Sequence, residues 1–305
     1  MSFSSDTKQE LCRLEPERDC CRRAECYGAF LLANSFSPSS VSLLTESAAV
    51  AHRAAQEAAE TAGVMAEVSS AVVRKGGRTT FAVSIPWEDQ RLRFLHHFSH
   101  RSGEVNLRIH EENLAHPCCV PAFLRGAFLS CGTVTAPEKG YDLEFSVPFM
   151  NLAHDLALLL GRAGGIGLQP AVANRKGRFI VYLRGGEKVA DLLTFLGATH
   201  ASMALMQAKM LKEMRNNLNR LNNFETANIG KTASAAARQL LAIEKIQATI
   251  GLGALPEDLR EIAFLRWENP ELSLRELGDM LSSPLSRSGV NHRLQRIVEL
   301  SERQS

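Results

Sequence analysis

The sequence predicts an α+β fold built from two similar halves, followed by an all-α C-terminal domain. Three observations carry this prediction: a helical segment that occurs twice, an order of helix and strand patterns that is repeated, and purely helical patterns after about residue 200. Helices mixed with antiparallel strands are typical of an α+β domain. We therefore expect a duplicated domain at residues 1–199, with repeats at about 1–100 and 101–199, a helical linker at 200–250, and a final helical domain at 251–305.

The repeated segment is the main evidence for duplication. Cys20–Leu31 reads CCRRAECYGAFL and Cys118–Leu129 reads CCVPAFLRGAFL, so seven of twelve residues are identical. Such self-similarity indicates a duplicated unit. Each copy has a glycine in the middle of its helical pattern, Gly28 and Gly126, and an internal glycine costs a helix about 1 kcal/mol relative to alanine. We expect the two helices to pack closely through these glycines; the alternative is two ordinary core helices.

The elements of the first half follow from apolar periodicity and turn residues. A short helix is expected over Ser4–Leu14, and the first repeat helix over about Asp19–Ala33. Ala48–Thr61 is alanine-rich and helical, and Gly63 closes it. The remaining elements are strands at Ser40–Leu44, Val64–Arg74 and Thr79–Ile85, the last two joined by the turn Lys75-Gly76-Gly77, and a helix at Gln90–His100.

The second half repeats this order of elements. The second repeat helix is predicted over Val120–Ser130, and Asp142–Val147 alternates as a strand does. The remaining elements are a helix at Met150–Arg162, strands at Leu168–Asn174 and Phe179–Leu183 on either side of the turn Arg175-Lys176-Gly177, and a helix at Lys188–Leu196. The repeated order supports the duplication.

The segment from Ser202 to about Ile250 has a helical pattern that is rich in asparagine. Asparagine is a mediocre helix former, so its density indicates either polar recognition or a buried network at a domain junction. The sequence leaves both interpretations open. The asparagines concerned are Asn216, Asn217, Asn219, Asn222, Asn223 and Asn228.

The second repeat helix resembles a known motif. Its string RGAFLSCG is similar to the LAGLIDADG motif of homing endonucleases, in which two such helices form the seam between pseudo-symmetric halves. Over nearly the whole chain the sequence resembles the WhiA family of sporulation and cell-division regulators. The strings that carry this resemblance are SFSSDTKQEL, MRNNLNRLNNFETANIGKT, SLRELGDML and SRSGVNHRL. The resemblance implies a pseudo-symmetric LAGLIDADG-like domain and a role in sporulation, or in cell division and chromosome segregation.

The positions that would carry nuclease chemistry lack the required acids. LAGLIDADG enzymes end each seam helix with an acidic residue that holds a divalent metal ion. Alignment on the glycines puts Ala33 and Cys131 at these positions, and Mg²⁺ requires oxygen ligands. We therefore expect no catalytic residues and a fold retained for binding.

Three other groups of residues resemble enzyme sites but lack a required feature. Ile229–Thr232 ends like a phosphate-binding loop, but Glu225 stands where that pattern needs glycine. His96, His97 and His100 are more typical of a solvated or hydrogen-bonded cluster than of a metal site. The cysteine pairs lack CxxC spacing, and adjacent thiols seldom share one metal ion. We expect structural burial for the cysteines, with no metal ion and no cofactor.

The C-terminal segment has the pattern of three short helices. The first begins at Pro256 and ends before Asn269-Pro270. Ser273–Glu276 has the form of a capping box and starts the second helix. The last helix follows a polar turn, and its buried face is Val290, Leu294 and Ile297. This arrangement resembles a helix-turn-helix of the sigma-factor type, with a turn about two residues longer than usual.

The exposed face of the last helix is the predicted DNA-binding surface. Recognition helices read bases with their N-terminal residues, and Arg and Asn suit guanine and adenine edges. Arg287, Ser288, Asn291 and His292 are therefore the candidates for base contacts, and Arg275 and Arg296 suit phosphates. The complete predicted set is Arg275, Ser286, Arg287, Ser288, Asn291, His292, Arg293, Gln295 and Arg296. The alternative is a small helical bundle with a solvated basic face.

The composition sets the remaining expectations. The net charge of +2 favours no partner class by itself, so the expectation of double-stranded DNA as a partner rests on the local charge of the last helix. Seven cysteines, an odd number, do not resemble a disulfide framework. We expect a cytoplasmic, nucleoid-associated monomer without a membrane segment, which a second regulatory protein could bind. The competing hypotheses are a metal-dependent nuclease or RNA-processing enzyme with an unrecognised site, and a partner-binding regulator whose N-terminal domain does not touch DNA.

Overall fold

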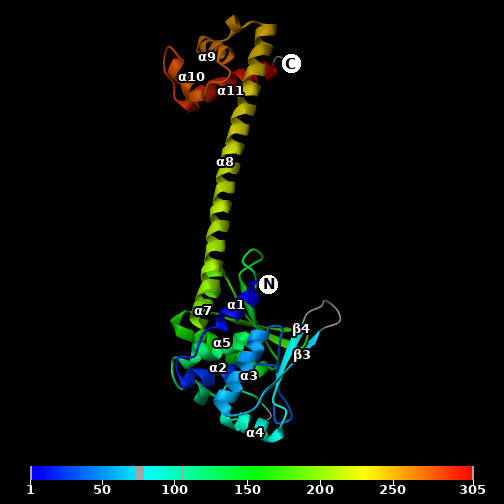
Figure 1. The fold of residues 1–305 in the computed structure, drawn as a ribbon. Helices are drawn as coiled ribbons and strands as arrows, with labels where there is room; N and C mark the ends of the chain where they lie inside the picture. Colours follow the sequence, from blue (N-terminus) through cyan, green and yellow to red (C-terminus); the bar gives the residue numbers. More distant parts are fainter. Residues whose placement is uncertain (1, 73–78, 105, 304–305) are drawn as a thin grey trace. The chain divides into compact units, whose positions relative to one another are not determined.

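The computed structural model describes residues 2–72, 79–104 and 106–303, apart from the side chains at 225 and 227–229. The chain divides into two compact units, Met1–Glu213 (unit 1) and Met214–Ser305 (unit 2). Unit 1 mixes helices with antiparallel sheets and unit 2 is helical (Figure 1), so the predicted fold class is confirmed. No helix in the described part of the chain is long and apolar enough to cross a membrane.

The two repeat helices form the centre of unit 1. They are α2 (Asp19–Leu31) and α5 (Cys119–Cys131), and both are largely buried. A Cβ atom added to Gly28 would overlap the backbone carbonyl oxygen of Phe123, and one added to Gly126 would overlap that of Glu25. Glycine is therefore required at both positions, because each helix backbone occupies the space where the other would carry a side chain.

Each half of unit 1 contributes one four-stranded antiparallel sheet. The two sheets have the same strand order, β1-β2-β4-β3 and β5-β6-β8-β7, which confirms the duplication at the level of topology. The strands of the first sheet are β1 (Ser35–Phe36), β2 (Val41–Thr45), β3 (Glu67–Val72) and β4 (Thr79–Ser84). Those of the second are β5 (Gly132–Val134), β6 (Asp142–Val147), β7 (Ala171–Arg175) and β8 (Arg178–Arg184).

The turn residues set the strand register of the β7–β8 hairpin. Lys176 and Gly177 both have positive φ, 50° and 78°, which is the geometry of a two-residue hairpin between paired Arg175 and Arg178. The predicted turn Lys75-Gly76-Gly77 of the first half lies outside the described residues. The short strands β1 and β5 were not predicted, because two or three residues are too few to show a period.

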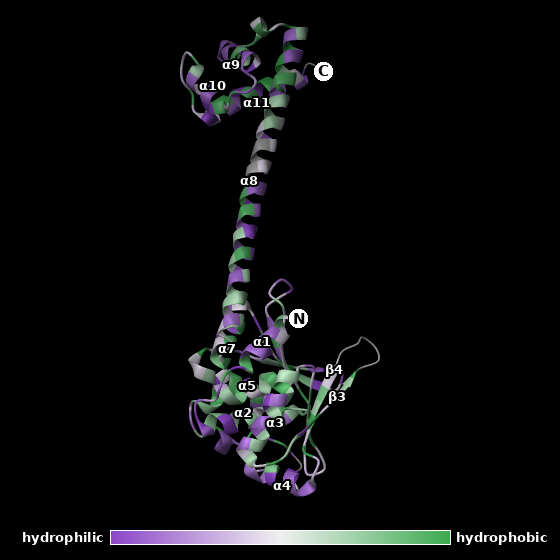
Figure 2. Cartoon of the chain, viewed as in Figure 1, coloured by the Kyte–Doolittle hydropathy of each residue, from purple (hydrophilic) through white to green (hydrophobic). Residues whose placement is uncertain are grey.

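The helices of unit 1 otherwise match the sequence pattern within a few residues. α3 starts with Ser47 as its N-cap and ends at Gly63, which has a φ of 61°. The helices are α1 (Phe3–Leu11), α3 (Ala48–Ala62), α4 (Glu88–His97), α6 (Met150–Arg162) and α7 (Gly186–Leu196), with short 3₁₀ turns η1 (Glu111–Leu114) and η2 (Ala163–Gly165). Figure 2 shows mostly hydrophobic residues along α5, consistent with its buried position.

The asparagine-rich segment is part of one long helix, α8 (Thr199–Thr249), which begins in unit 1 and ends in unit 2. Five of its six asparagines are exposed, and the side chain of Asn228 is not described. Exposure favours the interpretation as a polar surface over that as a buried network.

Unit 2 has a hydrophobic core of its own. It continues from α8 with η3 (Leu252–Ala254), α9 (Glu257–Glu268), α10 (Leu274–Met280) and α11 (Arg287–Arg303). Ile243 and Ile246 of α8 are fully buried in this core. The core of the helical domain thus takes residues from the segment expected to be a linker, and the domain limits drawn from the sequence stay predictions.

Candidate nucleic-acid interface

The start of α10 is fixed by a capping box, as predicted. The Ser273 hydroxyl accepts from the backbone N–H of Glu276 at 3.3 Å, and the Glu276 carboxylate accepts from the backbone N–H of Ser273 at 2.8 Å. These two bonds satisfy donors that the helix itself cannot pair. They also lower the pKa of Glu276. The sequence therefore positions α10 locally.

The turn before α11 is held by contacts that the sequence pattern did not reveal. The backbone N–H of Leu285 donates to the Gly278 carbonyl at 3.1 Å, and a Cβ at Gly278 would overlap the Leu285 carbonyl oxygen. Glu261 of α9 accepts from the backbone N–H and the hydroxyl of Ser282 at 2.7 and 2.9 Å. The longer turn is thus pinned to both preceding helices, which fixes where α11 begins.

The predicted surface of α11 is accessible at its N-terminal end. The Ser286 hydroxyl accepts from the backbone N–H of Gly289 at 3.3 Å and so caps the helix. The opposite face is buried in the core through Val290, Leu294 and Ile297. All of the predicted residues on this helix and its cap are exposed except Arg293, which is half-buried; they are Ser286, Arg287, Ser288, Asn291, His292, Arg293, Gln295 and Arg296.

Arg296 differs from the other predicted contacts because it already has a partner. Its guanidinium lies 3.1 Å from the carboxylate of Asp258 on α9, and both side chains are partly exposed. A phosphate contact by Arg296 requires this ion pair to open or be shared. Arg275, which projects from α10, is exposed.

A groove of about 790 Å³ adjoins the N-terminal end of α11. Arg275 and Arg287 line it together with Lys231 of α8, while Asp279 is the one acid among its described lining residues. The other lining residues are Thr232, Ala235, Ala236, Gln239, Arg266, Ser273, Leu274, Leu285, Ser286 and Asn291. The excess of cations gives the groove a positive potential, which attracts polyanions.

Arg266 anchors one wall of this groove and was not singled out from the sequence. It is buried and donates to the Gln239 side chain at 3.1 Å and to the carbonyl oxygens of Pro270 and Leu272 at 3.3 and 2.7 Å. Burial lowers the pKa of Arg266. The sequence signal that could have identified Arg266 is its place on the apolar face of α9, because an arginine buried there needs hydrogen-bond acceptors.

In the sequence, Lys231 belongs to the string Ile229–Thr232, which ends like a phosphate-binding loop. The structure places it within α8, which excludes the strand-loop-helix context of such a loop. On a helix that borders the groove, the same lysine adds a cation to the candidate interface.

The two positions that the sequence aligns with the acids of LAGLIDADG enzymes face one small cavity in unit 1. Ala33 and Cys131 both line this cavity of about 230 Å³, and none of its described lining residues is acidic. It presents Lys8 and Arg178 instead; the Lys8 ammonium donates to the Leu129 carbonyl at 2.9 Å. Burial raises the pKa of the Cys131 thiol to about 11. A hard divalent cation does not fit this set of donors.

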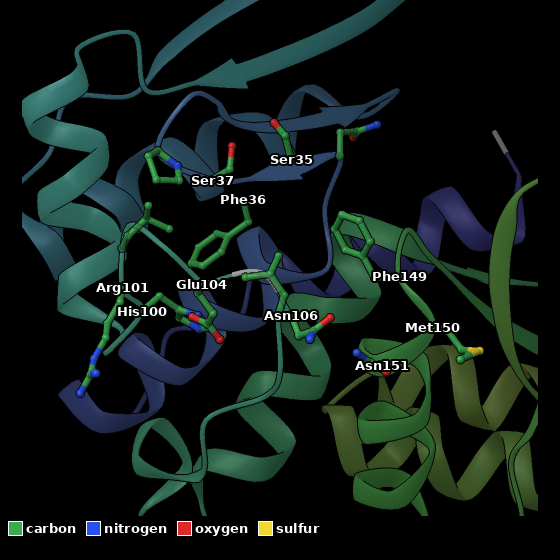
Figure 3. A pocket seen from close by; sticks show the side chains of 14 residues that line it. Ser35, Phe36, Ser37, His100, Arg101, Glu104, Asn106, Phe149, Met150 and Asn151 are labelled. Carbon is green, nitrogen blue, oxygen red and sulfur yellow. The ribbon is translucent and has the colours of Figure 1, made fainter.

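A larger cavity of about 450 Å³ lies between the halves of unit 1. Figure 3 shows His100 and Glu104 on one side of it and Phe149 and Asn151, at the start of α6, on another. His100 lies in a group with Glu104 and His110. Its Nδ1 atom is 2.7 Å from the Glu104 carboxylate, and its Nε2 atom is 2.8 Å from the Tyr27 hydroxyl. Burial lowers the pKa of His100, while Glu104 opposes the shift. The histidine is thus hydrogen-bonded within the fold, and the three histidines grouped from the sequence do not form one site.

The chain matches known proteins over its whole length. Two family models match it: the WhiA LAGLIDADG-like domain over residues 120–215 and the WhiA C-terminal HTH domain over residues 218–301. A probable cell division protein WhiA of Alkaliphilus metalliredigens is 36% identical and aligns over 100% of this chain and 98% of its own length. Its counterpart from Heliobacterium modesticaldum is 39% identical over 99% and 96% of the two chains. The crystal structure of full-length DUF199/WhiA from Thermotoga maritima has a TM-score of 0.60 and 24% identity and covers 99% of both chains, which supports the fold.

Proposed function

The chain belongs to the WhiA family of cell division proteins, and from that premise we propose that it is a non-catalytic transcriptional regulator that binds double-stranded DNA through α10 and α11. It acts in sporulation, or in cell division and chromosome segregation. The observation that carries the proposal is the exposed N-terminal end of α11 beside a groove lined by cations.

The residues divide between base contacts and phosphate contacts. Arg287 and Asn291 project from the first turns of α11, and their side chains suit bidentate bonds to guanine and adenine. Ser288 and His292 lie beside them on the exposed face. The phosphates are contacted by Arg275, and by Arg296 once it leaves Asp258.

Ser286, Arg293 and Gln295 complete the proposed DNA surface. Lys231 extends it along α8 on the other side of the groove. Contacts from these residues to phosphates would position the protein on the duplex without reading its sequence.

The LAGLIDADG-like unit is proposed to have no nuclease activity. Ala33 and Cys131 supply no carboxylate, and the cavity between them carries Lys8 and Arg178. Purified protein should cleave neither single- nor double-stranded DNA with Mg²⁺ or Mn²⁺. Site-specific cleavage that EDTA abolishes would instead support a metal-dependent nuclease.

The proposal also covers location and assembly. We place the protein at the nucleoid in the cytoplasm, as a monomer, with a second regulatory protein as the candidate partner of unit 1. Residues 251–305 are the proposed DNA-reading domain, residues 200–250 the linker and residues 1–199 the LAGLIDADG-like domain.

Sequencing of chromatin-bound DNA with tagged protein tests the function directly. The wild-type protein should enrich a limited set of sites that share a sequence, and the Arg287→Ala variant should lose that enrichment at equal protein level. The matched control is Arg303→Ala at the far end of α11, which should keep it. Absence of enriched sites with the wild-type protein would reject the proposal.

A further inference from the structure

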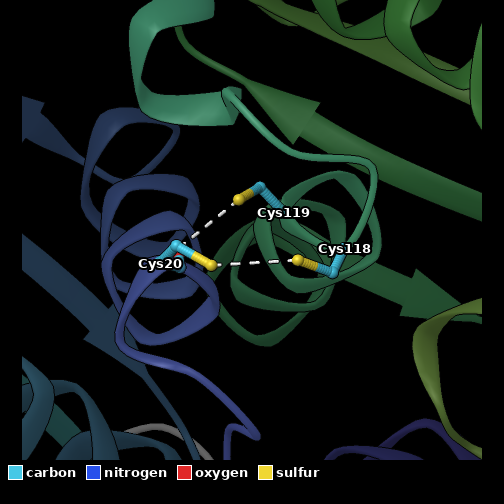
Figure 4. A group of neighbouring side chains, drawn as sticks. All are labelled: Cys20, Cys118 and Cys119. Carbon is cyan, nitrogen blue, oxygen red and sulfur yellow. Dashed lines mark hydrogen bonds between the residues drawn. The ribbon is translucent and has the colours of Figure 1, made fainter.

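Each seam helix begins with a pair of cysteines, and the pseudo-symmetry brings the two pairs together. Cys20 and Cys21 lie in the first turn of α2, while Cys118 is the N-cap of α5 and Cys119 its first residue. The Sγ atoms of Cys20 and Cys118 are 3.8 Å apart (Figure 4). Sγ atoms from Cys20, Cys118 and Cys119 all lie within 4.8 Å of one another.

The contacts of the second cysteine in each pair mirror each other. The Cys21 thiol donates to the Cys118 carbonyl at 3.5 Å, and the Cys119 thiol donates to the Cys20 carbonyl at 3.6 Å. Cys21 and Cys119 are buried, whereas Cys20 and Cys118 are partly exposed. The four thiols thus form one cluster with a buried side and an accessible side.

We infer that this cluster is a zinc site in which Cys20, Cys118 and Cys119 are ligands and Cys21 completes the coordination. Tetrahedral zinc thiolates have Zn–S bonds of about 2.3 Å, so their sulfur atoms are about 3.8 Å apart. The separation of Cys20 and Cys118 equals this edge. Coordination by Cys21 would replace the hydrogen bond that its thiol donates to the Cys118 carbonyl. The inference is independent of the proposed DNA binding.

The N-terminal ends of both seam helices lie at the cysteine cluster. Neither α2 nor α5 has a side-chain hydrogen bond at its N-cap, so both positive helix ends are available to the sulfur atoms. When Zn²⁺ binds, it displaces four thiol protons into solvent, and the site then carries a net charge of −2.

Adjacent cysteines seldom ligate one metal ion, so the sequence pattern alone does not predict a metal site here. The structure answers this objection directly, because the adjacent Cys118 and Cys119 both place their Sγ atoms within 4.8 Å of that of Cys20. Such a site would link the N-terminal ends of α2 and α5, which are 98 residues apart in sequence. It would therefore stabilise unit 1 at the seam.

The test uses full-length protein without a polyhistidine tag, purified with a reductant and analysed for zinc. We expect about one zinc ion per chain, and replacement by Co²⁺ should give thiolate-to-cobalt charge-transfer absorption with tetrahedral d–d bands. Cys118→Ser and Cys20→Ser should each lose most of this absorption. Cys12→Ser is the matched control, because Cys12 is also partly buried in unit 1 but lies outside the cluster, and it should retain both metal and absorption.

Measurements on the wild-type protein keep the test independent of variant folding. Titration with a chelator should release the zinc and lower the melting temperature. All seven cysteines should react as thiols in denaturant with chelator. Wild-type protein that neither retains zinc nor binds Co²⁺ would overturn the inference, as would two unreactive thiols, which would indicate a disulfide in place of a zinc site.

Discussion

At the scale of single residues, Glu25 joins the two halves of unit 1. It is fully buried and accepts from Arg53 of α3 at 2.7 Å and from Arg125 of α5 at 2.8 Å. One carboxylate thus pairs a guanidinium from each half. Glu57 completes the buried cluster, and burial together with the Glu25 charge raises the pKa of Glu57.

Removing the Glu25 charge should destabilise unit 1 strongly. Glu25→Gln leaves the largely buried Arg125 without its carboxylate and leaves Arg53 with Glu57 alone, and breaking such a pair typically costs about 3–5 kcal/mol. Glu60→Gln is the control, since Glu60 pairs with Arg22 at 2.8 Å with both side chains about one-third exposed; such pairs contribute about 0–1 kcal/mol. Urea unfolding followed by circular dichroism measures both. Equal losses in the two variants would mean that the buried network does not couple the halves.

The seam glycines should not tolerate even a methyl group. Gly126→Ala places a Cβ on the Glu25 carbonyl oxygen, so the helices must separate, at a cost of about 1–3 kcal/mol or more. Gly230→Ala in α8 is the matched control, because nothing lies within 4 Å of its added Cβ and alanine favours the helix by about 1 kcal/mol. Thermal melting should fall for the first variant only. A Gly126→Ala protein that melts like the parent would contradict the close seam.

Base and phosphate contacts should respond differently to truncation. Arg287→Ala should reduce discrimination between the target site and a mutated site by about 1–3 kcal/mol. Arg275→Ala should weaken binding to all sequences alike, because phosphates carry no sequence information. Binding titrations with both duplexes separate these outcomes. If Arg287→Ala weakened both duplexes equally, Arg287 would not contact a base edge.

At the scale of elements, the loop that follows α4 makes the stability of unit 1 depend on pH through His100. His100 is buried among Tyr27, Glu104 and His110, and burial lowers its pKa below the usual value of about 6.5. In the pH range below 6.5 the unfolded chain therefore binds more protons at this position than the folded chain does. Stability is gained as pH rises through this range and lost as pH falls.

Replacing His100 should flatten this part of the pH dependence. When the pH is lowered from 7 to below about 6.5, the free energy of unfolding should fall less for His100→Gln than for the wild-type protein. The opposite contribution of Glu57, whose raised pKa favours the folded state at lower pH, is common to both proteins and cancels in the comparison. His116→Gln, at an exposed position, serves as the control. Parallel pH profiles of the His100 variant and the wild-type protein would contradict the prediction.

At the scale of the whole molecule, the open question is whether unit 1 adds contacts to DNA. The proposed cations of unit 2 are Lys231, Arg275, Arg287, Arg293 and Arg296, each neutralising one phosphate at most. The slope of log affinity against log salt is about −0.9 per phosphate, so these five cations account for at most about −4.5.

One helix-turn-helix unit with so few cations should bind weakly by itself, so we expect unit 1 to add phosphate contacts and the full chain to show a steeper salt dependence than unit 2 alone. The fragment for this comparison begins at Met214, because a fragment beginning at Gly251 would lose the buried Ile243 and Ile246 from its core. Titrating the full chain and the fragment against one site at several salt concentrations gives both slopes. Equal slopes would mean that unit 1 does not touch DNA and would favour a partner protein as its ligand.

Much of the fold could be predicted because it depends on local and periodic patterns. The paired glycines, the order of helices and strands and the capping box at Ser273 are each visible within a short stretch of sequence. The resemblance to a known family then supplied the arrangement of the halves. The candidate DNA residues were located by rotating one amphipathic helix, which needs only the period of 3.6 residues.

The sequence by itself thus determined the α+β fold class, the duplication, the seam glycines and the exposed face of α11. Only the tertiary structure decided which distant side chains meet: Cys20 with Cys118, Lys8 with Ala33 and Cys131 in one cavity, Arg296 with Asp258, and Glu25 with an arginine from each half. The physical reason is that periodicity fixes the direction of a side chain from its own element alone. The partner it reaches depends on how two elements pack, and in unit 1 that packing is set by the close contact of α2 and α5 around the pseudo-symmetry axis.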